Sequence, residues 1–277
     1  IPPRSPSELA HLATSFDAAY KQLDDSQSQL RLEMQEKDKA KAELVNKLEL
    51  LDLKNAELQQ FTYIASHDLQ EPLRTIRSFV GVLSKKYGAG LDDDGRQMLG
   101  FVDEASLRMQ NLVRDLLDYG RIGKQTDRKP IDLSKLIEDV KSDIAESIKQ
   151  RDATISADQL PIVTGLETEL RLLLQNLISN AIKFTPSDSK PLVKIEAIEL
   201  EDRWQIGVHD NGIGIEAKYR DKVFGVFTRL HNRDEYPGTG IGLAHCKKVV
   251  ELHGGSIWIT GNDPQGSSVL FTLRKIS

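Results

Sequence analysis

The stretch RWQIGVHDNGIGI, residues 203–215, joins a strand pattern to a glycine-rich turn. Apolar residues alternate through 203–210, which predicts a β-strand that ends at Asp210. Gly212 and Gly214 follow at once, and glycines there let the backbone approach a flat ligand closely. The Asp210 carboxylate can accept a hydrogen bond from an exocyclic amine. An ordinary Asp-Asn-Gly hairpin turn explains the same letters, and this stretch alone favours the turn.

Upstream, the helical segment QNLISNAIKF, residues 175–184, carries Asn176, Asn180 and Lys183. Steps of four and three residues put these three side chains on one helical face. Asparagine oxygens suit a hard cation such as magnesium, and a lysine suits phosphate. The alternative is the solvent side of an amphipathic helix, which is the usual explanation for one asparagine but a weaker one for this trio.

Downstream, GTGIGLA at residues 238–244 places three glycines at the start of a predicted helix. Backbone amides of Gly238, Gly240 and Gly242 can hold phosphate there. No Gly-Lys-Ser/Thr follows, so the segment is not a P-loop, and it lacks the dinucleotide-binding spacing.

The segment KVFGVFTRLHNRDEYP, residues 222–237, lies between these motifs. Phe224 and Phe227 could anchor a mobile flap over a ligand, with Arg229 near its phosphate. Two ordinary core phenylalanines are an equally favoured interpretation.

The rest of the second half predicts a mixed α/β fold. Helices are expected over 133–150, 167–184 and 240–255, and strands over 153–157, 161–165, 192–200, 203–210, 256–260 and 267–274. The segments 192–200 and 203–210 are expected to form a hairpin.

The first half is helical, and its apolar residues recur in alternating steps of three and four. This ladder predicts one long helix that forms a coiled coil with its own copy. The glycines and acids of KKYGAGLDDDG, residues 85–95, break it, and a second helix follows to residue 122. Two antiparallel helices per chain, doubled in a homodimer, predict a four-helix bundle.

Composition narrows the function classes. The net charge is −5, so no basic face for nucleic acid is expected. Cys246 is the single cysteine, which excludes an internal disulfide and a cysteine metal cluster and fits a reducing, cytoplasmic setting. No run of eighteen apolar residues and no signal peptide occur. The chain lacks an initial methionine, so we expect a piece of a longer protein whose upstream part could hold a membrane anchor.

The order of the four motifs resembles the ATP-binding domain of sensor histidine kinases over residues 131–277. ASHDLQEPLR, within 58–122, resembles the phosphoacceptor box of their dimerisation domain, in the version found in phytochrome-like kinases. Residues 1–22 resemble, more weakly, the last helix of a HAMP module. The domains expected are therefore 1–22 HAMP helix, 23–57 coiled-coil signalling helix, 58–122 dimerisation and phosphotransfer, 123–130 linker and 131–277 ATP-binding.

The resemblance implies a kinase that phosphorylates His67 from Mg-ATP. His67 lies two positions before ladder residue Leu69, so its neutral imidazole should point away from the bundle and act as the nucleophile. Asp68 should accept from the other ring nitrogen. Pro72 cannot donate to the Asp68 carbonyl, so the helix should bend beside the histidine.

The resemblance also implies a nucleotide site. Adenine would lie toward Asp210, magnesium at Asn180, and a lid over residues 215–237 would close. The complete set of expected ATP-binding residues is Asn176, Asn180, Lys183, Phe184, Asp210, Gly212, Gly214, Phe224, Phe227, Arg229, Gly238, Thr239, Gly240, Gly242 and Leu243. The other histidines share no metal-ligand spacing and are expected to be structural.

The phosphohistidine would then pass its group to an aspartate of a separate response regulator. Many relatives carry Thr or Asn four residues after the histidine, where this chain has Glu71, which puts receiver phosphatase activity in doubt. Two alternatives remain: an ATP-driven conformational protein related to Hsp90, and a non-catalytic dimeric scaffold.

Overall fold

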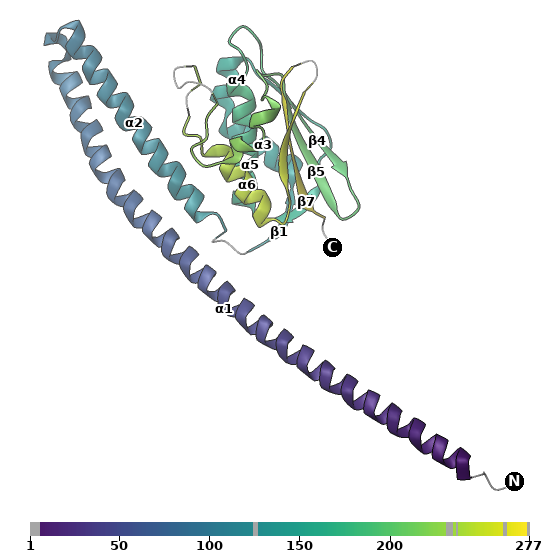
Figure 1. Ribbon diagram of the computed structural model, residues 1–277. Helices are drawn as coiled ribbons and strands as arrows, with labels where there is room; N and C mark the ends of the chain where they lie inside the picture. The colour runs from purple at the N-terminus through teal and green to yellow at the C-terminus, as the bar shows by residue number, and fades with distance from the viewer. Residues whose placement is uncertain (1–5, 124–126, 231–234, 237, 263–264, 276–277) are drawn as a thin grey trace. The chain divides into compact units, whose positions relative to one another are not determined.

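The computed structural model describes the chain except residues 1–5, 124–126, 231–234, 237, 263–264 and 276–277 (Figure 1). Within the long first helix it also leaves out the side chains of residues 6–15, 17–19, 25, 28, 48, 51–52 and 55–67. The chain divides into two units, Ile1–Phe61 and Thr62–Ser277, and each is described by itself. None of the described helices combines the length and the apolar composition that a membrane span requires.

The first unit, where described, belongs to helix α1, Pro6–Tyr87. Its described ladder residues are solvent-exposed, Phe16 at 74% and Leu30 at 59%. An apolar stripe left open along a helix needs a partner helix to cover it. The coiled coil and the HAMP helix stay predictions, since a single chain does not test them.

In the second unit, α1 continues through Pro72 to Tyr87, and the bend expected at Pro72 stays a prediction. A short turn, η1 (Gly88–Gly90), leads into α2, Asp93–Arg121. The Asp92 side chain caps α2 by accepting from Gly95 N at 2.8 Å. Figure 1 shows α2 running back beside the end of α1.

Arg77 ties the two helices of this hairpin together. Its guanidinium donates to Asp103 Oδ1 and Gln110 Oε1 of α2, each at 3.1 Å. Apolar packing contributes little to the contact between α1 and α2, because only some ladder residues are buried. Leu73 and Val80 of α1 are buried, whereas Ile76 and Leu83 are 43% and 44% exposed. The hairpin therefore has a further apolar face that this chain does not cover.

The α/β domain follows, and its elements are β1 (Lys129–Asp132), α3 (Leu133–Asp143), α4 (Ala145–Arg151), β2 (Thr154–Ala157), β3 (Ile162–Gly165), α5 (Glu167–Lys183), β4 (Leu192–Glu199), β5 (Arg203–Asp210), η2 (Ala217–Tyr219), η3 (Lys222–Phe224), α6 (Gly242–Leu252), β6 (Ile257–Gly261) and β7 (Ser267–Arg274). The main sheet has the order β2-β4-β5-β7-β6, and β1 pairs with β3 in a separate two-stranded sheet. Only the β2–β4 pairing is parallel within the main sheet. The hairpin expected from 192–200 and 203–210 is confirmed as β4–β5.

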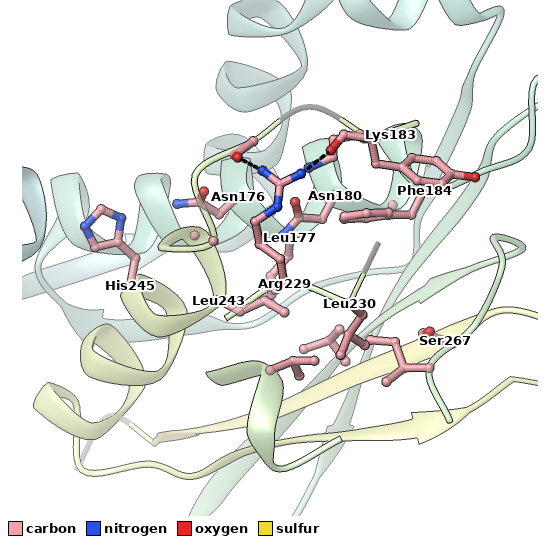
Figure 2. A pocket seen from close by; sticks show the side chains of 18 of the residues that line it. Asn176, Leu177, Asn180, Lys183, Phe184, Arg229, Leu230, Leu243, His245 and Ser267 are labelled. Atoms are coloured by element: carbon pink, nitrogen blue, oxygen red, sulfur yellow. Dashed lines mark hydrogen bonds between the residues drawn. The ribbon is translucent and has the colours of Figure 1, made fainter. Parts of the chain in front are cut away.

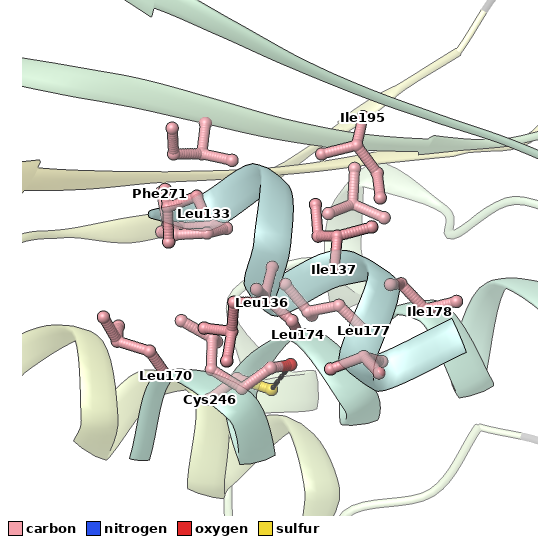
Figure 3. Packing of buried hydrophobic residues seen from close by; sticks show 14 of the residues in the cluster. Leu133, Leu136, Ile137, Leu170, Leu174, Leu177, Ile178, Ile195, Cys246 and Phe271 are labelled. Atoms are coloured by element: carbon pink, nitrogen blue, oxygen red, sulfur yellow. Dashed lines mark hydrogen bonds between the residues drawn. The ribbon is translucent and has the colours of Figure 1, made fainter. Parts of the chain in front are cut away.

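The core lies between the helices α3, α5 and α6 and one face of this sheet (Figure 3). Helix α3 buries Leu133, Leu136, Ile137 and Val140, which recur at helical spacing. Strand β4 alternates between the core and solvent, with Ile195 fully buried. The layer of helices on one sheet face leaves the strand ends free to build a site.

Two expected boundaries differ from the observed ones. Strand β1 begins at Lys129, inside the range 123–130 for which no regular structure was expected. Its partner β3 lies about thirty residues downstream, and a local pattern does not encode such a pairing. The single helix expected over 133–150 is two helices, with the break at Ile144, whose side chain is buried in the core.

His253, at the end of α6, joins this helix to Leu166 at the start of α5. Its Nε2 accepts from Leu166 N at 3.0 Å, and its Nδ1 lies 2.7 Å from the Val249 carbonyl oxygen. The ring is 3% exposed, and burial lowers its pKa. These contacts require the neutral ring with its proton on Nδ1, because a proton on Nε2 would displace the Leu166 amide.

We expect His253→Ala to lower the free energy of unfolding by about 2–4 kcal/mol, since it leaves a cavity and an unpaired buried amide. Because the folded pKa lies below the unfolded one, this contribution is present above the unfolded pKa near 6.5 and declines as pH falls. Chemical denaturation at neutral and acid pH measures both effects. Lys247→Ala, on the exposed side of α6, is the control; equal stability of the two variants would contradict the role given to His253.

Candidate functional site

A cavity of about 480 Å³ opens where the C-terminal half of α5, the end of β5 and the start of α6 meet. Twelve of the fifteen residues predicted to bind ATP line it: Asn176, Asn180, Lys183, Phe184, Asp210, Gly214, Arg229, Gly238, Thr239, Gly240, Gly242 and Leu243. These residues come from segments up to 67 positions apart. The fold thus brings four separate sequence motifs to one cleft.

Helix α5 contributes its polar face to this cavity. Its apolar residues, such as Leu173 and Ile178, are buried in the core, so Asn176, Asn180 and Lys183 face the other way. The Asn176 amide nitrogen donates to the Leu172 carbonyl at 3.0 Å, which leaves its oxygen to accept. The amide oxygens are hard donors of the kind that magnesium prefers. No cluster of three or more acidic, histidine or cysteine ligands occurs among the described residues.

Lys183 is a partly buried cation in this wall. Burial, and then repulsion from Arg229, lower its pKa to about 8. Its Nζ lies 4.2 Å from the centre of the Phe184 ring, and that ring packs at 5.1 Å against Tyr236. Among the described residues, no carboxylate forms a salt bridge with Lys183 or Arg229. Two cations held close together favour a polyanion.

The Arg229 side chain donates hydrogen bonds to two backbone carbonyl groups. Its guanidinium donates to the carbonyl oxygens of Gly238 and, at 3.0 Å, of Tyr236 (Figure 2). Figure 2 shows these two bonds amid Asn176, Asn180 and Lys183. The arginine therefore ties the segment after η3 to the beginning of the glycine-rich loop.

Asp210 ends β5 and also lines the cavity. Its Oδ1 accepts from Gly212 N at 2.9 Å and from Ser267 N at 3.0 Å. Burial raises its pKa, and these two backbone bonds oppose that rise. Since both bonds use Oδ1, Oδ2 is the oxygen left to accept from a ligand.

Gly240 shows why the loop before α6 needs glycine. It has φ +77°, and a Cβ there would lie 2.9 Å from the Thr228 carbonyl oxygen and 3.0 Å from the Phe227 carbonyl carbon. Both obstacles are backbone atoms, which cannot rotate away. The loop thus packs directly on the segment that carries Arg229.

Three predicted residues do not line the cavity. Gly212 supports it indirectly through its bond to Asp210. Phe224 is buried with Val223 and Ile259 in a small core cluster, whereas Phe227 is 55% exposed with φ 62°. Their spacing suits a flap, but the Phe224 ring is buried in the core whereas the Phe227 ring is exposed to solvent. The predicted lid includes residues 231–234 and 237, which lie outside the described residues.

The predicted acceptor residues lie in α1. His67 belongs to the helix, but its side chain lies outside the described residues. Asp68 and Pro72 are exposed. Their proposed roles stay predictions.

Several lining residues were not predicted from the sequence. Tyr236, Ser267 and His245 line the cavity, and His245 stacks on Tyr119 with ring centres 5.5 Å apart. Asn111, Asp115 and Asp118 of α2 also line it, and Thr239 Oγ1 donates to Asp115 Oδ2 at 2.5 Å. No local pattern indicates the α2 residues or Ser267, because only the packing of α2 and β7 brings them to the cavity. Tyr236 lies within the expected lid and His245 within α6, but neither residue type in isolation indicates a ligand.

Two family models match this chain. The His Kinase A (phospho-acceptor) domain matches residues 57–125, and the histidine kinase-, DNA gyrase B- and HSP90-like ATPase matches residues 165–276. The first span contains His67, and the second contains Asn176, Asp210 and Gly240. The chain belongs to the sensor histidine kinases. In this histidine kinase most residues that line the cavity described above lie within the ATPase match.

The histidine kinase chain is 42% identical over 224 residues to cyanobacterial phytochrome A of Nostoc sp. (strain PCC 7120), covering 80% of the chain but 29% of the relative. It thus spans less than a third of the length of that relative.

Two solved structures share its fold. Full-length ShkA in complex with AMPPNP has a TM-score of 0.60 at 23% identity, covering 79% of this chain and 46% of that one. The histidine kinase ThkA in complex with response regulator protein TrrA has a TM-score of 0.55 at 20% identity, covering 80% and 64%.

Proposed function

We propose that this chain is the catalytic portion of a protein-histidine kinase that transfers the γ-phosphoryl group of Mg-ATP to His67. One observation carries the proposal: the α5 polar face, Asp210 and the glycine-rich loop share one cavity, in a chain whose first helix holds the SHDLQEPLR box. In the reaction a ring nitrogen of His67 bonds to the γ-phosphorus, and the bond to the β,γ-bridging oxygen breaks. ADP leaves, and the ring loses its proton from the other nitrogen.

The base would bind at Asp210. Its Oδ2 accepts from the exocyclic amine of adenine, because Oδ1 is occupied by Gly212 N and Ser267 N. A base with a carbonyl at that position would face the carboxylate with a second acceptor. This arrangement supports a preference for adenine nucleotides.

The phosphates would bind between α5 and the glycine-rich loop. Lys183 and Arg229 supply positive charge, and the backbone amides of residues 238–242 supply donors. Arg229 would exchange its bonds to the Tyr236 and Gly238 carbonyls for phosphate oxygens, which links nucleotide binding to movement of that loop. Magnesium would be held by Asn180, with Asn176 beside it; when bound, it neutralises developing charge on the phosphates.

At the acceptor end, Asp68 would orient His67 by accepting from its second ring nitrogen, and Pro72 would weaken the helix one turn further along. The chain's own task is to position the ring and remove its proton. Positioning and charge neutralisation account for most of the rate in phosphoryl transfer.

The partners would be a second copy of the chain and a response regulator. The exposed ladder residues of α1 and α2, Leu69, Ile76, Leu83, Val102 and Met109, support a homodimeric four-helix bundle. Phosphohistidine would then donate to an aspartate of a response regulator, as the pairing of ThkA with TrrA suggests by analogy. Both ATP and such receivers are cytoplasmic, so this portion would work in the cytoplasm.

Incubation with γ-labelled ATP and magnesium tests the proposal. We expect label on the protein that is labile in acid and stable in base, the behaviour of a phosphoramidate. ATP turnover without protein label would instead identify an ATP-driven conformational protein, and absence of nucleotide binding would identify a scaffold.

Nucleotide affinity should depend on Lys183 ionisation. In the free protein its pKa is about 8, and bound phosphate should raise it. Only the charged form attracts phosphate, so affinity should be highest below this pKa and fall about tenfold between pH 7.5 and 9.5. Isothermal titration with Mg-ATP across this range measures the fall.

Lys183→Arg is the matched control, because arginine stays charged throughout and should remove this dependence. An equally steep fall in Lys183→Arg would assign the titration to another group.

A further inference from the structure

A row of polar side chains crosses three strands on the sheet face opposite the helices. His209 Nδ1 of β5 lies 2.7 Å from Ser268 Oγ of β7. On the other side, His209 Nε2 lies 3.2 Å from Glu196 Oε1 of β4, close enough for electrostatic attraction but without hydrogen-bond alignment. Ser268 is 5% exposed.

Gly207 makes room for this ring. It precedes His209 by two positions on the same strand and face, and a Cβ there would lie 2.4 Å from His209 Nε2. The imidazole therefore lies flat over the Gly207 backbone, between β4 and β7. Such a fit holds the ring in one orientation.

Charge around the ring selects its tautomer. Glu196 faces Nε2, and Lys194 Nζ lies 2.7 Å from the Glu196 carboxylate. A carboxylate beside Nε2 favours the proton on that nitrogen, so we assign Nδ1 as the acceptor of the Ser268 hydroxyl proton. The hydroxyl and the ring then form one specific bond between β5 and β7.

This bond lies beside the bond that orients Asp210. His209 and Ser268 are directly paired in the β5–β7 register. Their neighbours Asp210 and Ser267 make the Oδ1–amide bond of 3.0 Å. Because side chains alternate across a strand, the two bonds lie on opposite faces of the same strand pair.

The turn between β6 and β7 also contacts Asp210. The Asn262 side chain donates to the Asp210 carbonyl at 2.8 Å, and a Cβ on Gly266 would lie 1.9 Å from the same oxygen. The backbone of this turn therefore touches Asp210, and a small shift of β7 along β5 would move the Ser267 amide away from the carboxylate.

We infer that His209, through its hydrogen bond to Ser268, is a positioning residue that sets the orientation of Asp210 and so the selectivity of the site for an exocyclic amine. This inference rests on the proposed function, since it takes Asp210 to be the group that reads the base. It gives a role to a histidine for which the sequence predicted only a structural one.

Three variants isolate the bond. Ser268→Ala removes the hydroxyl. His209→Asn keeps a polar atom at the Nδ1 position, and His209→Gln keeps one only near Nε2. A fourth variant, Thr272→Val, is the control, because it removes another buried hydroxyl of β7, one that accepts from Ser256 N at 3.0 Å, far from Asp210.

The measurement is the ratio of affinities for Mg-ATP and Mg-ITP, by isothermal titration of the whole chain. Inosine carries a carbonyl where adenine carries the amine, so the wild type should prefer ATP. We expect Ser268→Ala and His209→Gln to lower the ratio about three- to tenfold, through weaker ATP binding alone. His209→Asn and Thr272→Val should keep it within about twofold.

Equal loss of ATP and ITP affinity, or an unchanged ratio in Ser268→Ala, would overturn the inference while leaving Asp210 as the base-reading group. The inference would also be overturned if His209→Asn lowered the ratio of ATP to ITP affinity as far as His209→Gln does. A wild type that binds both nucleotides equally would remove the proposed role of Asp210 and this inference with it.

Discussion

His67→Gln should lower incorporation of γ-labelled phosphate by at least about 10³-fold while leaving Mg-ATP affinity unchanged. Glutamine has a similar length but no nucleophilic ring nitrogen, so the transfer has no acceptor. The nucleotide cavity is lined by residues from 111 onward. The substitution at His67 should therefore not change the affinity for Mg-ATP. Autophosphorylation and isothermal titration of the same preparation measure the two quantities.

Glu71→Gln is the matched variant, because it changes one side chain a single helical turn further along α1. We expect it to retain the label. Label that persists in His67→Gln would place the acceptor elsewhere in the chain, and loss of nucleotide binding in that variant would point to a folding defect.

Gly240→Ala should weaken Mg-ATP binding on the order of 100-fold. An alanine there needs φ +77° and places its Cβ 2.9 Å from the Thr228 carbonyl. The strain of such a position is about 1–3 kcal/mol, and each 1.4 kcal/mol corresponds to a factor of ten. The loop must shift to relieve it, which moves its amides away from the phosphates.

Gly254→Ala separates strain from function. Gly254 also has a positive φ, +70°, but its Cβ would meet only the flexible Arg274 side chain. Both variants should lose stability in thermal unfolding through the positive φ, and only Gly240→Ala should lose affinity for the nucleotide. Equal nucleotide affinity in the two variants would show that the glycine-rich loop does not hold the phosphates.

Most elements of the α/β domain could be predicted from local patterns. The strands β4 and β5 and the helix α5 begin within one residue of their expected starts, because alternation and helical spacing are visible in short windows. The polar face of Asn176, Asn180 and Lys183 could be predicted for the same reason, since helix geometry alone fixes which residues share a face.

The pairing of distant segments could not be predicted in this way. Strand β1 depends on β3, and Ser267 reaches Asp210 only because β7 pairs with β5. Phe224 and Phe227 have the same spacing as a flap motif, yet one ring is buried and the other is exposed.

The sequence by itself determined most of the helices and strands and the chemical character of each motif, because periodicity, glycine and charge act over a few residues. Strand β1 and the break at Ile144 are the exceptions. Only the tertiary structure decided which side chains meet, as with His209 and Ser268 across β5 and β7. The reason is physical: strand register is set by burial of the whole sheet face against α3, α5 and α6, and no single segment contains that information.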